Sequence, residues 1–478
     1  MLAESFAPSP ESLPPTSARV SIAPRSPVSA LIYITGGTDK GRARAGNEDH
    51  FVIDHGLGLA VVCDGMGGHA AGDLASALGA RVFHEAVLAS KDQIRDYLDC
   101  ANAPQHVGKS DIAHLLQWAA NAASRAIHEE AVRSADKAGM GTTLIGVLVL
   151  NNHAFIVNVG DSRAYLLREG ELEQLTRDHN VYNELIRRKK LRPESVKQIA
   201  PKNALTRAVG IYEHCEAETL IIDVAEGDRV LLCSDGLYRY FEPPEGSADE
   251  LERRLLEEDD ERVVQSLIES ANARGGKDNI TAVVMTLGKV GDYDTRSLAE
   301  LSARREALAN SPLFALLDER ELMRVLSMTD VQVHSPGDTI VAPNDTGRDL
   351  YVVLSGCVAV CHSGSLVAEL KTGQHFGEMS LLRERPGSAH VLATQLTELL
   401  VIPREAFFAL LRSEHELGMK LLWQLTSVLA ERLAETRHDL GQTRVELETE
   451  DLSRAVFSAD DDGRITLRPP SFLPLGPR

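Results

Sequence analysis

The sequence lacks a long apolar run, a paired cysteine motif and an excess of positive charge. No apolar run approaches the roughly 18 residues that a membrane-spanning helix needs. The six cysteines include no Cys-x-x-Cys pair, so they indicate neither a disulfide framework nor a zinc site. The first residues, MLAESFAPSPESLPP, do not show the basic and then apolar order of a secretory signal. These absences predict a cytoplasmic protein without a membrane partner.

The charge balance points the same way. The chain has 50 Lys and Arg against 70 Asp and Glu, which gives a formal net charge of −20. A surface with this excess of negative charge repels the phosphates of nucleic acids and anionic lipids. We therefore expect no nucleic-acid partner.

The length of 478 residues exceeds what one ordinary core accommodates, so the sequence predicts more than one domain. Residues 1–30 are rich in Pro, Ser and Ala and are predicted to be disordered. A first domain is expected over 31–289, a polar linker over 290–310 and a second domain over 311–437. A helical extension and a disordered tail are expected over 438–478.

Apolar spacing predicts the main elements of both domains. In the first domain it predicts helices over about 72–88, 111–133 and 248–273, and strands over 143–150, 154–159 and 163–167. In the second it predicts many short strands over about 330–403, flanked by helices, with a long helix over about 414–448. The fold class is therefore α+β.

Four aspartates lie where short apolar runs meet turns. Asp64 ends LGLAVVCDG and Asp235 ends DRVLLCSDG, while Asp49 closes NED and Asp278 opens DNITAVVMTL. One aspartate at the end of a strand is an ordinary turn residue. Four carboxylates that converge at the rim of a sheet repel one another unless a cation lies between them. The set predicts a site for a hard, oxygen-preferring ion such as Mg²⁺ or Mn²⁺.

Six motifs, in this order, make residues 38–287 resemble the bacterial form of the metal-dependent serine/threonine protein phosphatases, the type 2C or PPM family. They are TDKGRARAGNED (38–49), VVCDGMGGHAAGDLAS (61–76), GTTL (141–144), VGDSRAY (159–165), LTRDH (175–179) with LTRAVG (205–210), and SDGL (234–237) with GGKDNITAVV (275–284). The resemblance implies an αββα sandwich, in which two antiparallel sheets are covered by helices and the metal ions bind at one edge between the sheets.

The resemblance also implies a role for each acidic position. Asp64 bridges two metal ions, and the backbone carbonyl of Gly65 helps to hold one of them. Asp235 and Asp278 complete the shell of the first ion. Two Mn²⁺ or Mg²⁺ ions are thus implied.

Four further positions follow from the same resemblance. Glu48 and Asp49 anchor the second ion, partly through water, and Asp161 matches a position that serves a third, weaker ion. Arg44 matches the arginine that binds the substrate phosphate, which suits its planar guanidinium. Two cations about 3.5–4 Å apart lower the pKa of a bridging water, and the resulting hydroxide attacks phosphorus in line.

The proton donor is the point where the chain departs from the eukaryotic members. Those members have a histidine directly after Asp-Gly, and here Met66 takes that place. His69, three residues further on, is a candidate catalytic residue, with a purely structural role in the GGH turn as the alternative. A metal-bound water is another candidate for the acid.

Residues 312–437 resemble the cyclic-nucleotide-binding domain, a small β-roll flanked by helices. The matching segments are SPGDTIVAPNDTGRDLYVVLSGCVAV (335–360) and GQHFGEMSLLRERPGSAHVLAT (373–394). Gly377 and Glu378 match the phosphate-binding cassette, in which the glutamate takes a ribose hydroxyl. The arginine that pairs with the cyclic phosphate is replaced by Gly387, with Arg383 and Arg385 as candidate substitutes. Losing a charge-assisted contact weakens binding about tenfold or more, so cyclic nucleotide binding stays open.

The leading hypothesis is a protein serine/threonine phosphatase that is regulated or localised by its C-terminal domain. Its expected partners are phosphorylated proteins, the products of Ser/Thr kinases, and a cyclic nucleotide or other small effector. One alternative keeps the catalysis and makes the second domain a dimerisation or docking module, through the face of Leu417–Leu429. Another alternative is a non-catalytic scaffold that binds phosphoproteins.

Overall fold

The computed structural model describes two units, Met1–Thr295 and Arg296–Arg478. The described residues are 32–67, 70–99, 107–187, 204–288, 298–343, 349–362, 364–382, 389–456, 458–459 and 465–466. Residues 1–30, predicted to be disordered, lie outside these ranges, as do residues 457, 460–464 and 467–478 of the predicted tail. The long helix predicted to end at about residue 448 continues to Val456. In the described part of the chain, no helix combines the length and the apolar character that crossing a membrane requires.

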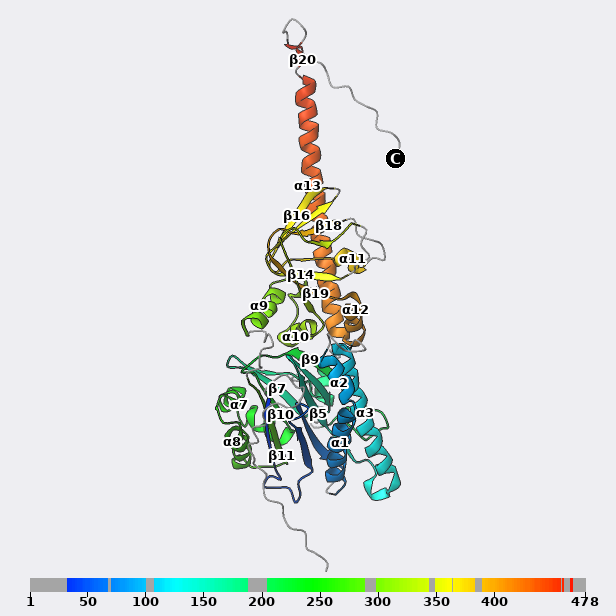
Figure 1. Ribbon diagram of the computed structural model, residues 1–478, viewed down its shortest axis with the longest axis vertical. Helices are drawn as coiled ribbons and strands as arrows, with labels where there is room; N and C mark the ends of the chain where they lie inside the picture. Colours follow the sequence, from blue (N-terminus) through cyan, green and yellow to red (C-terminus); the bar gives the residue numbers. More distant parts are fainter. Residues whose placement is uncertain are drawn as a thin grey trace, which may run out of the picture. The chain divides into compact units, whose positions relative to one another are not determined.

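The first unit contains two antiparallel sheets (Figure 1). One has the order β2-β3-β5-β6-β9, with β4 paired to β3, and the other has the order β1-β11-β10-β7-β8. The strands of the first are β2 (Asp49–Asp54), β3 (Leu59–Met66), β4 (Gly141–Thr142), β5 (Leu144–Leu150), β6 (His153–Val159) and β9 (Glu218–Asp223). Those of the second are β1 (Ile32–Asp39), β7 (Arg163–Arg168), β8 (Glu171–Gln174), β10 (Arg229–Cys233) and β11 (Ile280–Leu287).

Helices cover both sheets. Helix α1 (Ala70–Ala89) packs on β3, and α3 (Lys109–Arg133) packs on β6 and β9. On the other sheet, α8 (Asp260–Ala273) packs on β1 and β11, and α7 (Ala248–Leu255) packs on β8. Figure 1 shows the resulting order of helix, sheet, sheet and helix layers. The αββα sandwich is confirmed.

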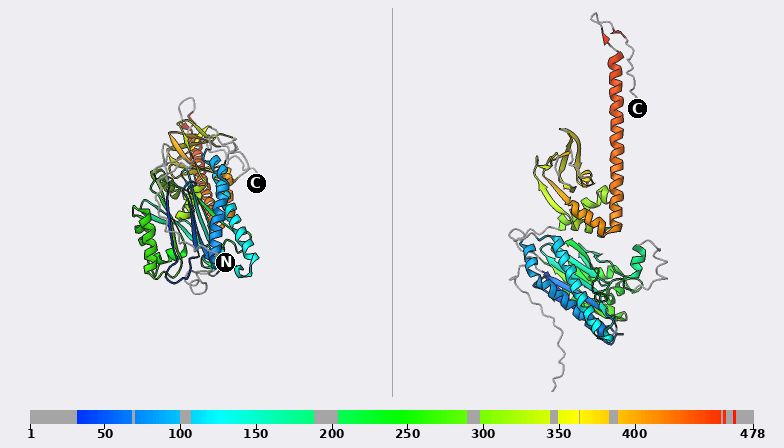
Figure 2. Two further views of the ribbon diagram at one scale, coloured as in Figure 1. Left: turned by 60° about the horizontal axis from the view of Figure 1, so that its bottom comes forward. Right: turned by 90° about the vertical axis from the view of Figure 1, so that its right-hand side faces the viewer.

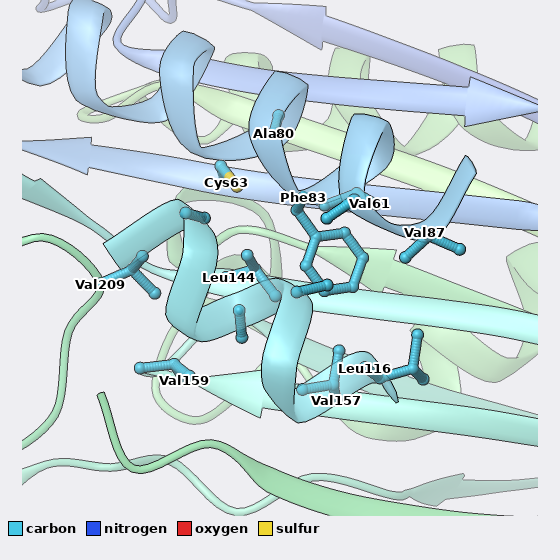
Figure 3. Close-up of a cluster of buried hydrophobic side chains, with 14 of the residues drawn as sticks. Val61, Cys63, Ala80, Phe83, Val87, Leu116, Leu144, Val157, Val159 and Val209 are labelled. Carbon is cyan, nitrogen blue, oxygen red and sulfur yellow. The ribbon is translucent and has the colours of Figure 1, made fainter. Parts of the chain in front are cut away.

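Strand β3 shows why the core forms between α1 and the sheet. Val61 and Cys63 are fully buried in one cluster with Phe83 of α1 and Leu116 of α3 (Figure 3). The intervening Val62 is also fully buried, on the other face of the sheet. A strand that is covered on both faces reads as a continuous apolar run, which is what LAVVC shows. The same burial holds Asp64 rigidly at the end of the strand.

Two local predictions need correction. The helix predicted over 248–273 is two helices, because Asp259 caps the second by accepting hydrogen bonds from the backbone of Glu261 and Arg262. Helix α2 (Lys91–Leu98) was not predicted. This helix has eight residues and buries only Ile94 and Tyr97, so its sequence has too few apolar positions to show a helical period. Among the described residues, this unit also contains the short helices α4 (Val181–Arg187) and α6 (Asp235–Tyr238).

The second unit is a β-roll of two four-stranded antiparallel sheets, which confirms the second part of the predicted fold. Their orders are β12-β19-β14-β17 and β13-β18-β15-β16. The strands are β12 (Asp330–His334), β13 (Thr339–Val341), β14 (Leu350–Ser355), β15 (Cys357–His362), β16 (Ser365–Lys371), β17 (His375–Phe376), β18 (Ala389–Ala393) and β19 (Thr397–Ile402). The helices are α9 (Leu298–Ala309), α10 (Glu319–Ser327), α11 (Glu378–Leu382), α12 (Arg404–Ser413) and α13 (His415–Val456), the last seen as one long helix in Figure 2.

Two predictions about this unit are also corrected. The segment expected as a linker, 290–310, contains α9, and Leu308 of that helix is fully buried in the core of the second unit. The face proposed for docking is core as well, because Leu417, Leu421 and Leu425 are 3%, 0% and 1% exposed. The exposed apolar residues of α13 lie elsewhere, at Met419, Trp423 and Leu433.

Candidate functional site

The register of the strands brings acidic residues from distant motifs together in the first unit. Asp49 of β2 lies directly opposite Asp64 of β3 in the antiparallel ladder. Asp235 begins α6 just after β10, and Asp278 precedes β11, the neighbour of β10. Asp161 follows β6, the second neighbour of β3 in the same sheet. These aspartates, which come from both sheets, are near enough to one another for their charges to affect each other's pKa values.

Burial and mutual repulsion make these carboxylates hard to ionise. Burial, followed by repulsion from Asp49, Asp235, Asp161 and Asp278, raises the pKa of Asp64 well above its usual value. Burial raises the pKa of Asp49 to about 7, and burial with repulsion from Asp235 raises that of Asp161 to about 7. Such a cluster is stable in its charged form only when positive charge is supplied.

Hydroxyl groups orient Asp49. Its Oδ2 accepts hydrogen bonds of 2.7 Å from Ser234 and from Thr281, which favour the charged form. Its Oδ1 is buried and has no hydrogen-bond partner among the described residues. A buried carboxylate oxygen without a partner is costly, and a cation is the kind of group that satisfies it.

The GTTL motif holds the backbone of Asp64. The Asp64 amide donates a hydrogen bond to the Thr143 hydroxyl oxygen at 2.9 Å. The Asp64 carbonyl accepts from the Thr142 hydroxyl and from the Thr143 amide, both at 2.9 Å. These threonines, with Ser234 and Thr281, were not predicted as site residues. Their positions inside the GTTL, SDGL and DNIT motifs were the available signal.

Close packing of glycines fixes Glu48 beside β3. The Gly65 amide donates to the Glu48 carbonyl at 3.1 Å, and the Ser76 hydroxyl donates to the same oxygen at 2.5 Å. A Cβ atom at Gly72 would lie 2.1 Å from Glu48 Oε2, and one at Gly65 would lie 2.2 Å from the Gly72 carbonyl oxygen. At Gly65 the clash is with backbone atoms, so only glycine fits, whereas a Cβ atom at Gly72 would displace the end of the Glu48 side chain.

Two arginines supply positive charge to the cluster. Arg44 Nη2 lies 2.8 Å from Asp278 Oδ1 and 2.9 Å from Oδ2, and its side chain is 47% exposed. The Arg239 guanidinium forms an ion pair with Asp235. Arg239 was not predicted, because it lies outside the SDGL tetrapeptide and pairs one helical turn away.

The donor set fits divalent cations. Among the described residues, no group of three or more His, Cys, Asp or Glu side chains is placed so that, as it stands, it could hold a metal ion. Two of the carboxylates are engaged by arginines, and Asp49 Oδ1 is left unpartnered. One glutamate and five aspartates, with no histidine or cysteine among them, are the kind of oxygen donors that is typical of Mg²⁺ or Mn²⁺ sites.

The remaining predicted residues of the first unit divide into two groups. His69 lies outside the described residues, and Met66 is the last residue of β3. The arginine of the GDSR motif, Arg163, is a structural residue, because its guanidinium makes two hydrogen bonds of 2.8 and 2.9 Å to the Asp178 carboxylate. It also lies 3.6 Å from the centre of the Tyr238 ring.

The cassette of the second unit is paired internally. Glu378 begins α11 and is 5% exposed, and Arg432 of α13 donates to its Oε1 at 2.5 Å and to the His375 carbonyl at 3.0 Å. Gly377 has a φ of +96°, and a Cβ atom there would lie 2.3 Å from the Asp349 carbonyl oxygen. Arg383 and Arg385 lie outside the described residues. Nothing in the sequence around Glu378 signalled an arginine 54 positions later.

Comparisons with known proteins agree with both units. Residues 19–270, just over half of the chain, match the family model of Protein phosphatase 2C, and residues 331–414 match that of the Cyclic nucleotide-binding domain. The chain is 34% identical over 259 residues to the serine/threonine phosphatase stp of Listeria monocytogenes, which covers 52% of this chain and 93% of the relative. It is 30% identical over 381 residues to PstP of Mycobacterium tuberculosis, covering 76% of this chain and 66% of the relative.

A solved structure is also similar. It is the catalytic domain of PstP in complex with two manganese ions, with 32% identity and a TM-score of 0.43, covering 54% of this chain and 99% of that one. On the family-model match, the chain belongs to the Protein phosphatase 2C family, and it carries a C-terminal cyclic nucleotide-binding domain. It is an enzyme, a protein phosphatase.

Proposed function

We propose that this chain hydrolyses phosphoserine and phosphothreonine esters in proteins, using two divalent cations held by the acidic cluster. The observation that carries the proposal is the facing pair of Asp49 and Asp64, joined by Asp235 and Asp278 from the second sheet. Two phosphatases that are similar to the chain in sequence are named for serine and threonine, and a similar solved structure contains two manganese ions.

The residues divide the work as follows. Asp64, with Asp235 and Asp278, would hold one ion, with the Gly65 carbonyl as a further donor. Asp49 and Glu48 would hold the other. When bound, Mn²⁺ or Mg²⁺ supplies Lewis acidity, which activates water and neutralises charge on the phosphate.

Arg44 would bind the substrate phosphate. Its guanidinium now pairs with Asp278, and nearly half of the side chain is exposed. With Asp278 serving as a metal ligand, the Arg44 guanidinium would be free to bind two oxygens of a phosphate through its planar fork. The same group then stabilises the charge that develops in the transition state.

Phosphate release from a phosphothreonine peptide tests the proposal. We expect Mn²⁺-dependent release in the wild type and a loss of at least about a thousandfold in Asp64→Asn, since removing a main electrostatic element has an effect of that order. Asp92→Asn is the matched control, because Asp92 is an exposed helix residue with a side chain 78% exposed. Equal rates of phosphate release in Asp64→Asn and in the control would contradict the role of Asp64 in catalysis.

We propose that the second unit regulates or localises the phosphatase, and that it does so without binding a cyclic nucleotide. Glu378, the expected partner of the ribose, is already engaged by Arg432, and the arginine expected for the phosphate is replaced by Gly387. Calorimetry with cyclic AMP and cyclic GMP tests this. Absence of heat at millimolar nucleotide supports a docking or dimerisation module, and saturable binding restores the sensor hypothesis.

The compartment is part of the proposal. The five cysteines in the described ranges are free thiols, and two of them, Cys63 and Cys233, are fully buried. Thiols that stay unpaired fit the reducing cytoplasm, where phosphorylated products of Ser/Thr kinases are the natural substrates.

A further inference from the structure

Arg239 is a cation built into the acidic cluster. It lies one helical turn after Asp235, and its guanidinium pairs with the Asp235 carboxylate, whose side chain is only 13% exposed. Its backbone is held in the same turn, because the Arg239 amide donates to the carbonyls of Asp235 and Leu237. Both the side chain and the backbone of Arg239 are therefore tied to Asp235.

The charge of Arg239 acts on more than its direct partner. Asp161 and Asp278 lie within range of the guanidinium, and its presence lowers the pKa of Asp161 against the effects of burial and of Asp235. Arg44 serves another part of the cluster, where it contacts Asp278 and acts on Glu48 and Asp64. Each arginine thus pairs with a different carboxylate of the cluster, Arg44 with Asp278 and Arg239 with Asp235.

The two arginines differ in how easily each side chain could move away from its aspartate. Arg44 comes from a loop far from Asp278 in sequence and is 47% exposed, so it can turn toward a substrate. Arg239 is 35% exposed and belongs to the same turn as its partner. An exposed pair at this spacing on a helix surface contributes little. The Asp235 carboxylate, by contrast, is nearly buried and has further acidic neighbours. The Arg239 guanidinium therefore lies where the negative charges of the cluster call for a cation.

We propose that Arg239 is the resident cation at the Asp161–Asp235 end of the cluster, where it takes the place of a metal ion and leaves the site with two divalent cations. The inference rests on the proposed function. In this arrangement one oxygen of Asp235 is held by the guanidinium and the other is left for metal. Asp161 is then neutralised by the protein itself and is not a metal ligand, contrary to what the sequence resemblance implies.

Calorimetric titration of the metal-free full chain with Mn²⁺ tests this, because it counts ions without measuring activity. We expect two ions in the wild type and three in Arg239→Met, which keeps the length of the side chain and removes its charge. Arg239→Lys, which keeps the charge, should bind two. Arg81→Met is the matched control, since Arg81 forms an exposed pair with Glu85 at the same spacing, and it should also bind two.

Asp161 provides a second measurement that does not depend on the folding of Arg239→Met. Asp161→Asn should still bind two ions, and Asp161→Asn with Arg239→Met should lose the third. Three ions in the wild type, or loss of an ion in Asp161→Asn alone, overturns the role of Arg239. Two ions in Arg239→Met with unchanged affinity also overturns it. A wild type that binds no Mn²⁺ contradicts the proposed function instead.

Discussion

At the scale of single residues, the site is an assembly of carboxylates that the fold alone does not neutralise. Asp49 is 2% exposed, with one oxygen bonded to two hydroxyls and the other without a partner in the described residues. Sequence reasoning identified Asp49 from its place beside a strand. It did not identify Ser234 and Thr281, because a hydroxyl that supports a carboxylate has no pattern of its own in sequence.

The raised pKa of Asp49 predicts how the metal-free protein responds to pH. The folded chain keeps a proton up to about pH 7, whereas the unfolded chain releases it near 3.8. The stability from this group is therefore full below pH 3.8 and is lost as pH rises through 7. Between pH 5.5 and 8 we expect the melting temperature of the metal-free first unit to fall by at least about 2–4 °C, the effect of about 1 kcal/mol.

Calorimetry in EDTA, with and without excess Mn²⁺, measures this effect. Asp49→Asn should flatten the pH dependence, since an amide does not titrate, whereas Asp92→Asn should leave it as in the wild type. Mn²⁺ should restore the stability at pH 8, because the ion binds the deprotonated carboxylates. An identical pH profile in Asp49→Asn would contradict the role given to burial.

At the scale of elements, the contact between α1 and β3 shows how backbone packing sets the site. Gly72 in the first turns of α1 touches Glu48, and Gly65 at the end of β3 touches Gly72. The motif around Asp64 could be read from the sequence, and so could the helix after it. The close contact between Gly65 and Gly72 could not be predicted from the sequence, because it depends on how the helix approaches the strand.

Gly72→Ala tests this packing. The added Cβ would lie 2.1 Å from Glu48 Oε2, so Glu48 must move. We expect little cost in the free energy of unfolding, because the clash is with the far end of a flexible side chain. We also expect Mn²⁺ affinity to fall by at least about tenfold, as for other disturbed supports of metal ligands.

Gly46→Ala is the matched control for denaturant unfolding and Mn²⁺ titration. A Cβ atom at Gly46 meets nothing within 4 Å, although the residue lies in the neighbouring GNED segment. Wild-type Mn²⁺ affinity in Gly72→Ala would show that Glu48 is not held by this contact.

At the scale of the whole molecule, each unit has a hydrophobic core of its own. Phe83 and Leu116 belong to a core of the first unit, and Leu350 and Leu421 belong to a core of the second. The proposed metal residues all lie in the first unit. We therefore expect each unit to respond separately to changes at its own polar contacts.

Arg432→Ala is the variant that separates the two responses. It leaves the buried Glu378 carboxylate without its partner, at a cost of about 1–3 kcal/mol to the second unit. In calorimetry of the full chain, one transition should fall, while the transition that Mn²⁺ raises should stay in place. Addition of Glu378→Gln should recover part of the loss, because it removes the unpaired charge.

Arg437→Ala is the control on the same helix, since Arg437 is exposed. If the control lost as much stability as Arg432→Ala, the effect would come from the helix and not from the ion pair between Arg432 and Glu378. A fall of the Mn²⁺-sensitive transition in Arg432→Ala would show that the two units do not respond separately.

Local patterns of apolar residues and turns were enough to predict the two domains, the family and the aspartates that lie next to strands. The partners of the polar groups became known from the folded chain: Ser234 and Thr281 on Asp49, Arg239 on Asp235 and Arg432 on Glu378. It also showed that Leu421 is core and not a docking face. The reason is physical, since ionic contacts and burial depend on which surfaces meet, and chain neighbours do not specify that.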